Sequence, residues 1–153
     1  MNGVWLESSM RVVIQRVKSA RVISLHDAAE QQIGKGLLVF LGCEKDDTEC
    51  IAQSYCKKIA HMRIFPDTGG KMNCSAVDID SDMMVIPNFT LAADTATGTR
   101  PSFSTAMKSQ GAQELYDFFC HAMTSYFGVV KKGFFGQEME VELTNSGPVT
   151  FLL

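Results

Sequence analysis

The chain has 153 residues, of which 46% are apolar and 20% charged, and its formal net charge is −3. This composition is typical of one globular domain with a buried core, and it excludes a largely disordered chain. The acidic balance also argues against a protein that coats a long nucleic-acid backbone, because such binding depends on many Lys and Arg contacts. Contact with a short nucleic-acid end remains compatible with this charge.

The first nine residues, MNGVWLESS, have no pattern of their own. They lack the basic start and apolar stretch of a signal peptide, and no later run reaches the length of a membrane-spanning helix. We therefore expect a cytoplasmic protein with no membrane partner. Residues 1–9 are predicted to be a loose N-terminal extension, and residues 10–153 a single domain.

The domain is predicted to begin with strands. From Met10 to Ala20, apolar and polar residues alternate as in a half-buried strand, and Arg21 to Leu25 continues this strand or pairs with it. A polar turn is expected over 26–32. The glycines of 34–36 then lead into the apolar run 37–41, which predicts a central strand covered on both faces.

Two helices are predicted further along the chain. Thr48 can cap the first, in which Ile51, Tyr55 and Ile59 recur at four-residue spacing, and the second spans 109–127. About seven or eight strands accompany these helices, which predicts a mixed α/β fold with no internal repeat. The remaining strands are expected at 62–65, 83–86, 129–134, 139–143 and 149–153.

Possible metal ligands do not form a recognisable site. The five cysteines are odd in number and include no C-x-x-C pair, and the three histidines have no partner at ligand spacing. The acidic groups Asp46-Asp47 and Asp78/Asp80/Asp82 are interpreted as solvated loop faces, because the second set lacks the glycine and terminal glutamate of a calcium loop. No metal and no cofactor are expected.

Two segments that combine polar residues with proline are the best candidates for a functional site. No G-x-S-x-G, phosphate-loop or HExxH motif is present. Segments 87–91 and 145–150 each adjoin an apolar strand, and the loop 87–103 is too long for a plain connection. Thr90 and Thr150 have no neighbouring His or Lys to activate them as nucleophiles, so hydrogen-bonding roles are expected. Taken alone, segment 145–150 predicts a turn before a final strand.

Six segments together resemble the D-aminoacyl-tRNA deacylase family. The resemblance covers nearly all of the chain after residue 9, and it depends on the order and spacing of the segments. They are MRVVIQRV (10–17), KMN (71–73), FTLAADT (89–95), GTRPSFSTA (98–106), GFFG (133–136) and NSGPVTFLL (145–153).

The resemblance implies a homodimeric editing enzyme with active sites at the subunit interface. Such an enzyme hydrolyses the ester that joins a D-amino acid, or glycine mischarged on tRNA(Ala), to the 3′-terminal adenosine of tRNA. No metal or cofactor is implied. The expected fold is a single compact domain in which mixed, largely antiparallel sheets form a barrel-like core beside two main helices.

The resemblance also implies a stereochemical filter near the C-terminus. The residues matching Gly147 and Pro148 form a cis peptide whose carbonyls enter the partner subunit's pocket and leave no room for an L side chain. The arginine matching Arg16 braces this element. Val149 and Thr150 are expected to line the substrate site.

Catalytic roles are implied for main chain rather than for side chains. Groups near Phe89 and Thr90 would stabilise the oxyanion, while the tRNA's own 2′-hydroxyl would move the proton. Phe135 matches an aromatic residue that stacks near the terminal adenine, where any base offers a π-face. Core packing is the alternative interpretation of Phe135.

The chain departs from the family at Pro87-Asn88, where Ser-Gln is usual. Proline removes a hydroxyl and an N–H donor, and asparagine shortens the amide side chain. A related branch of editing deacylases also carries proline there and is thought to accept a small L residue. Phe89 and the NSGPVT segment favour the D-specific activity. A deacylase for a small L-aminoacyl-tRNA, a non-catalytic dimer that binds tRNA ends and a hydrolase with Thr90 as nucleophile remain alternatives.

Overall fold

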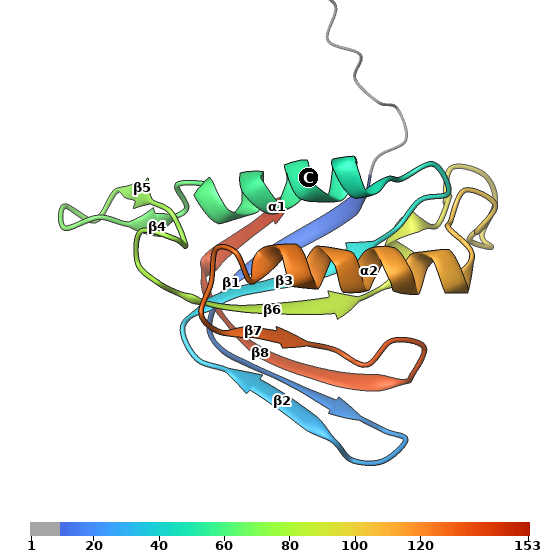
Figure 1. Ribbon diagram of the computed structural model, residues 1–153, viewed down its shortest axis with the longest axis horizontal. Coiled ribbons are helices and arrows are strands. Elements are labelled where there is room, and N and C mark those ends of the chain that lie inside the picture. The colour runs from blue at the N-terminus through green and yellow to red at the C-terminus, as the bar shows by residue number, and fades with distance from the viewer. Residues whose placement is uncertain (1–9) are drawn as a thin grey trace, which may run out of the picture.

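The computed structural model describes residues 10–153, so the prediction for residues 1–9 lies outside the described part of the chain. Two helices, α1 (Glu49–His61) and α2 (Ser109–Met123), lie over one face of a bent sheet (Figure 1). Within the described residues, no helix has both the length and the apolar character needed to cross a bilayer.

The main sheet has six strands in the order β2-β1-β3-β6-β7, and β8 also pairs with β1. Pairing is antiparallel around β1 and parallel from β3 through β6 to β7. A separate two-stranded ribbon is formed by β4 (Phe65–Pro66) and β5 (Met72–Cys74). The main strands are β1 (Arg11–Ser24), β2 (Glu30–Ile33), β3 (Gly36–Gly42), β6 (Asp82–Pro87), β7 (Val130–Lys132) and β8 (Met139–Leu152).

A sharp bend in β1 and β8 folds the sheet over on itself (Figure 1). The β1–β8 ladder is irregular between Gln15 and Ser19, which is where the strands change direction. One core lies between the sheet and the helices and includes Leu37, while the other lies inside the fold of the sheet and includes Leu38. The predicted barrel-like α/β fold and the central position of β3 are therefore confirmed.

The start of α1 is also confirmed. The Thr48 hydroxyl accepts a hydrogen bond from the Ile51 N–H at 3.3 Å, and Glu49 lies in the first turn, where the helix dipole favours a negative charge. Along β1, Arg21 to Ser24 continues the first strand rather than pairing with it.

Several predicted boundaries are wrong. The polar segment 26–32 was expected to be a turn, but Glu30–Ile33 forms β2, because a ladder needs only main-chain groups and here buries only Ile33. The strand predicted at 62–65 starts only at Phe65. Met62 still donates its N–H to Lys58 O at 2.9 Å as the chain leaves α1.

Two further predictions near the C-terminus are corrected in the same way. Helix α2 ends at Met123 instead of residue 127, and short turns carry the chain on to Phe127, which is buried although it is not helical. The strands predicted at 139–143 and 149–153 are one strand, β8, from which a short excursion leaves the ladder.

Candidate functional site

The first candidate element is the Gly-Pro loop, residues 145–150 of β8. Asn145 pairs with Val17 and Thr150 with Gln15, so the four residues between them leave the β1 ladder at the bend of the sheet. The Gly147–Pro148 peptide bond is cis. A Cβ atom on residue 147 would clash with the main-chain nitrogen of Val149, so this position has room only for glycine.

Asn145 closes the base of the Gly-Pro loop. Its Nδ2 donates to Gln15 Oε1 at 2.6 Å and to Val149 O at 3.0 Å, and its Oδ1 accepts from the Val149 N–H at 3.1 Å. The Thr150 hydroxyl donates to the same Gln15 oxygen at 2.8 Å. The amide of one side chain therefore satisfies both main-chain groups of Val149, which is buried.

Arg16 fixes the loop from the side of β1. Its Nε donates to Ser146 O at 2.9 Å and its Nη1 donates to Ile64 O at 2.8 Å. Hydrogen bonds from a charged donor are stronger than neutral ones, so the guanidinium links the loop to the segment after α1. Both acceptors are neutral carbonyls, and the positive charge is not cancelled by them.

The second candidate element is the short 3₁₀ helix η1 (Phe89–Ala92), which follows β6. Asn88 donates its N–H to Leu41 O at 2.8 Å, and Gly42 allows the close approach, since a Cβ there would lie 2.9 Å from Asn88 O. Phe89 is 63% exposed. Within residues 10–153, neither the Phe89 nor the Thr90 N–H has a hydrogen-bond acceptor. Two adjacent main-chain donors are therefore free to bind a ligand oxygen.

Pro87 is compatible with its place at the end of β6. Because alternate N–H groups along a strand point to opposite sides, and the Asn88 N–H points toward β3, the N–H of residue 87 would point toward β7. The Gly133 N–H, directly after β7, still donates to Val85 O at 2.9 Å, and the N–H of residue 87 would be the next donor in this direction. Proline at 87 has no such donor and therefore ends the pairing between β6 and the β7 segment.

Side chains near η1 offer no activated nucleophile. The Thr90 hydroxyl donates to the Asn88 carboxamide oxygen, and an amide cannot act as a general base. Burial raises the pKa of the Cys43, Cys56 and Cys120 thiols to about 12, so these are not thiolates near neutral pH. In the described part of the chain, no three His, Cys, Asp or Glu side chains gather to hold a metal.

Phe135 contacts Tyr116, which bonds to β6, the strand that leads into η1. Its ring is half-buried and packs on Tyr116, with 5.9 Å between the ring centroids. The Tyr116 hydroxyl donates to Val85 O at 2.7 Å and accepts from the Gly133 N–H at 3.0 Å. Burial raises the Tyr116 pKa, so the hydroxyl remains a donor. Sequence analysis missed Tyr116 because its partners are distant in the chain.

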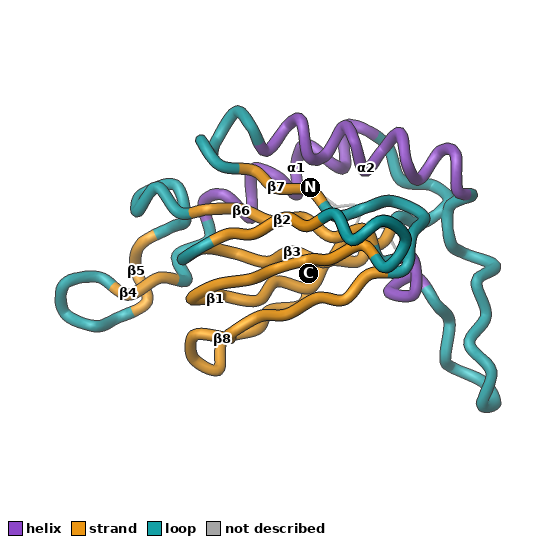
Figure 2. The backbone as a smooth tube through the Cα atoms, turned by 90° about the horizontal axis from the view of Figure 1, so that it is seen from below, coloured by secondary structure: helices purple, strands orange, loops and turns teal. Residues whose placement is uncertain are grey.

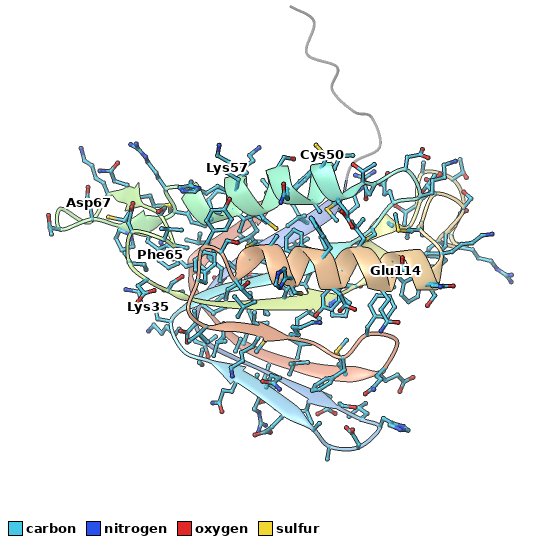
Figure 3. The ribbon with its side chains drawn as sticks, viewed as in Figure 1. Lys35, Cys50, Lys57, Phe65, Asp67 and Glu114 are labelled. Carbon is cyan, nitrogen blue, oxygen red and sulfur yellow. The ribbon has the colours of Figure 1, made fainter. Side chains whose placement is uncertain are left out.

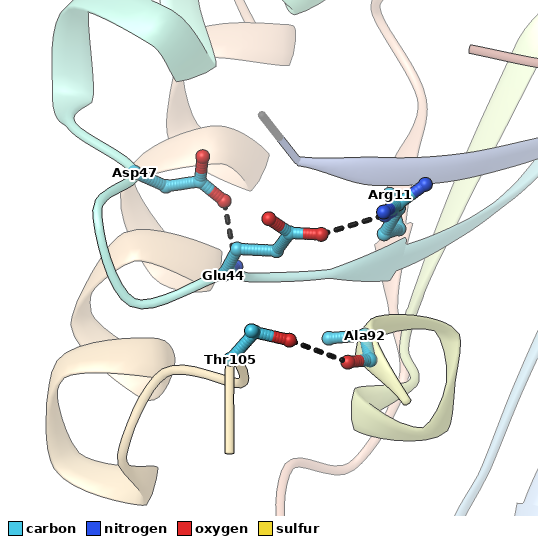
Figure 4. A network of polar contacts seen from close by, with 5 residues as sticks. All are labelled: Arg11, Glu44, Asp47, Ala92 and Thr105. Atoms are coloured by element: carbon cyan, nitrogen blue, oxygen red, sulfur yellow. Dashed lines mark hydrogen bonds and ion pairs between the residues drawn. The ribbon is translucent and has the colours of Figure 1, made fainter. Parts of the chain in front are cut away.

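A polar network lies beside η1, with Glu44 and Asp47 buried and Arg11 exposed (Figure 4). Arg11 Nε lies 2.6 Å from Glu44 Oε1, and Asp47 Oδ2 accepts from the Glu44 N–H at 2.7 Å. The Thr105 hydroxyl donates to Ala92 O at 3.3 Å. A cavity of about 490 Å³ lies between this network and residues 91–96. Sequence analysis did not single out Arg11, Glu44 or Thr105.

Asp47 corrects the interpretation of Asp46-Asp47 as a solvated loop. Asp46 is exposed, but Asp47 is only 8% exposed, and its Oδ1 has no hydrogen-bond partner within residues 10–153. Burial raises its pKa to about 6, and the negative charge of Glu44 adds to the effect.

The predicted site residues form two groups within one chain. Gly147, Pro148, Val149, Thr150 and Arg16 lie where the β1–β8 ladder is interrupted, whereas the segment 87–90 continues from the end of β6. The bend of β8 and the end of β6 lie at opposite ends of the sheet (Figures 1 and 2). Phe135 belongs with the second group, because it packs on Tyr116, whose hydroxyl binds Val85 O in β6. Strand β3 connects the two groups, because Leu37 pairs with Arg16 and Leu41 O accepts a hydrogen bond from the Asn88 N–H. Leu37 and Leu41 are four residues apart, which is roughly 13 Å at the usual rise of a strand. No hydrogen bond among the described residues joins the two groups.

Comparisons with known proteins agree with this arrangement of elements. D-aminoacyl-tRNA deacylases of Idiomarina loihiensis and Pseudoalteromonas translucida are 46% and 45% identical to the chain, covering 92% and 94% of it and 97% and 99% of their own lengths. A solved structure of a c-Myc DNA unwinding element binding protein has a TM-score of 0.87 at 31% identity, over 94% of this chain and 97% of that one.

A second solved structure, of a probable eukaryotic D-amino acid tRNA deacylase, has a TM-score of 0.84 at 17% identity, over 94% of this chain and 98% of that one, a likeness of fold alone. The model of the D-Tyr-tRNA(Tyr) deacylase family matches residues 13–153. This match spans the Gly-Pro loop, η1 and nearly all of the described residues, and the chain therefore belongs to the D-Tyr-tRNA(Tyr) deacylase family of hydrolases.

Proposed function

We propose that this protein is a cytoplasmic editing enzyme that hydrolyses D-aminoacyl-tRNA, and glycine mischarged on tRNA(Ala), and rejects L-aminoacyl-tRNA. Close relatives bearing the deacylase name support the reaction. The observation that carries the catalytic part is the pair of free N–H groups at Phe89 and Thr90, in a segment whose hydrogen bonds involve no acid or base side chain.

In this proposal the substrate supplies its own proton carrier. Water attacks the ester carbonyl carbon, and the 2′-hydroxyl of the terminal ribose relays the water proton to the departing 3′-oxygen as the acyl–oxygen bond breaks. The Phe89 and Thr90 N–H groups donate to the carbonyl oxygen as it becomes negative. Phe135 is the candidate stacking partner of the terminal adenine.

Stereochemical selection is assigned to the Gly-Pro loop of a second subunit. The Gly-Pro loop and η1 lie at opposite ends of one chain, so a homodimer would place the loop of one protomer against η1 of its partner. A rigid wall of main chain beside the Cα atom leaves space for hydrogen but not for an L side chain. The tethers from Arg16 and Asn145 supply that rigidity.

The proposal is tested by deacylation of D-tyrosyl-tRNA, glycyl-tRNA(Ala) and L-tyrosyl-tRNA under one set of conditions. Loss of the D-tyrosyl and glycyl esters with retention of the L-tyrosyl ester is expected. Preferential loss of the L ester would overturn the proposal. Binding of D-tyrosyl-tRNA without hydrolysis above background would favour a non-catalytic dimer.

Gly147→Ala tests the wall itself. Its added Cβ displaces Val149, so the ratio of D to L hydrolysis should fall roughly 10-fold, the range that one methyl-sized contact contributes to discrimination. Gly128→Ala is the matched control, because a Cβ there meets no atom within 4 Å. An unchanged ratio in Gly147→Ala would remove the loop from the mechanism.

A substrate ending in 2′-deoxyadenosine tests the proton relay. Its D-tyrosyl ester should survive where the ribose form is cleaved, while Thr90→Ala should retain most of the activity. Full reactivity of the deoxy substrate, together with an inactive Thr90→Ala protein, would instead favour Thr90 as a nucleophile.

A further inference from the structure

A positively charged groove adjoins the Gly-Pro loop on the same protomer. It encloses about 390 Å³ beside Ser146, and Phe65 and Pro66 line its apolar side. Arg16, Lys18 and Lys35 supply the charged lining, and no acidic residue lines it. This local charge contrasts with the net charge of −3 of the whole chain.

The sheet brings the two lysines together. Val17 pairs with Gly36 and Ala20 with Ile33, so Lys18 on β1 lies beside the connection between β2 and β3 that contains Lys35. Lys18 is exposed and lies at the irregularity of the β1–β8 ladder. Both lysines therefore line the same groove, where an external anion would meet two ammonium groups at once.

Few protein groups neutralise this charge. Within residues 10–153, no carboxylate lies within ion-pair distance of Arg16, Lys18 or Lys35. Asp82, which pairs with Gly36, accepts a hydrogen bond from the Gly34 N–H at 2.9 Å through its Oδ2. Arg16 spends two of its N–H donors on neutral carbonyls, so its charge remains available.

We propose that this groove binds phosphate groups in the 3′ strand of the tRNA whose ester faces the adjoining Gly-Pro loop. This assignment rests on the proposed function. Because Ser146 belongs to both the loop and the groove, a ribose held at the loop carries its 5′-phosphate toward the lysines. Three cationic side chains can neutralise a few successive phosphates of a single-stranded end, whereas binding along a long duplex would need a wider basic surface.

The experiment compares a substrate that has phosphates with one that has none. Lys18→Ala/Lys35→Ala is assayed on D-tyrosyl-tRNA and on the D-tyrosyl ester of adenosine. We expect about a 10-fold lower kcat/KM on the tRNA, through KM, with no change on the adenosine ester. The salt dependence of log kcat/KM on the tRNA should become shallower by roughly 0.7 for each phosphate that the double variant no longer neutralises.

Lys57→Ala/Lys58→Ala is the matched control, since it removes the same charge from exposed positions on α1. Lys57 projects from the outer side of this helix, whereas Lys35 and Phe65 lie at the end of the molecule where β1 bends (Figure 3). An equal loss in both double variants, or an equal loss on both substrates, would overturn the groove assignment.

Binding of uncharged tRNA separates this inference from the proposed function. If the wild-type protein hydrolyses neither D ester, the proposed function fails. Weaker, less salt-dependent binding of tRNA by Lys18→Ala/Lys35→Ala would then still support the groove, and unchanged binding would overturn it.

Discussion

The Gly-Pro loop and the segment that follows β6 are held in place in different ways. The loop is fixed by side chains from β1, with Arg16 and Gln15 bonded to it and Asn145 closing its base. The segment 87–106 keeps its ends near the sheet but has exposed aromatic rings and mostly local hydrogen bonds. Under the proposed function this difference is useful, because a stereochemical filter must stay rigid, whereas a surface that receives different side chains can adapt its shape.

Arg16→Ala should have the largest effect, because it removes the bond to Ser146 O in the Gly-Pro loop and the bond to Ile64 O that links Arg16 to the segment after α1. We expect roughly a 100-fold loss of kcat/KM on D-tyrosyl-tRNA, since each charge-assisted bond contributes about 1.5 kcal/mol. Arg16→Lys should recover only part of it, because an ammonium cannot reproduce the guanidinium fork.

Arg21→Ala is the control on the same strand. Its ion pairs with Glu30 and Glu142 are exposed, so little activity should be lost. If Arg21→Ala lost as much activity as Arg16→Ala, the loop would not owe its rigidity to specific tethers.

Asp47→Asn should have an intermediate effect. It should change the free energy of unfolding and leave substrate specificity unchanged. Burial raises the pKa of Asp47 to about 6 in the folded protein, above the ordinary value of 3.8 that applies in the unfolded chain. Between these two pH values the unfolded chain has lost the proton and the folded protein keeps it, so the free energy of unfolding falls as pH rises. The asparagine variant should lack this fall and be more stable by about 1–2 kcal/mol at pH 7.

Urea unfolding at pH 4, 5, 6 and 7 measures this difference. Asp46→Asn, at the exposed neighbouring position, should keep the wild-type pH profile. If the wild type and Asp47→Asn showed the same dependence of stability on pH, Asp47 would not carry a buried charge in the folded protein.

Phe103→Ala should have the smallest effect. The rings of Phe89 and Phe103 lie 5.2 Å apart and are both exposed, and such a pair contributes about 0.5–1.5 kcal/mol. We expect a 3- to 10-fold lower kcat/KM, in line with that energy, and an almost unchanged Tm. Val129→Ala, which also truncates an exposed apolar side chain, should leave both values unchanged. A drop in Tm for Phe103→Ala would show that segment 87–106 is structural.

Local patterns were sufficient to predict much of the fold. The Thr48 cap locates α1, and the continuous apolar run 37–41 identifies a strand buried on both faces. Strand β2 has no such pattern, because its pairing with β1 depends on main-chain groups. Segment 145–150 was visible as a turn, but its tether to Ile64 through Arg16 joins residues far apart in the chain.

The candidate site was also predictable only where a local motif marks it. Phe89, Thr90 and the Gly-Pro pair belong to such motifs. Tyr116 and Asp47 do not, since their roles depend on burial and on partners that the fold supplies. The nearness of Lys18 and Lys35 also emerges only once the register of β1 is known.

The double hydrogen bond of Tyr116 has a consequence for how this enzyme can change over time. One hydroxyl joins α2, the end of β6 and the turn that carries Phe135. We therefore expect substitutions on the outer surface of α2 to leave the mutual spacing of these three parts unchanged. The solvent side of the helix can then diversify while the contact between Tyr116 and Phe135 is kept.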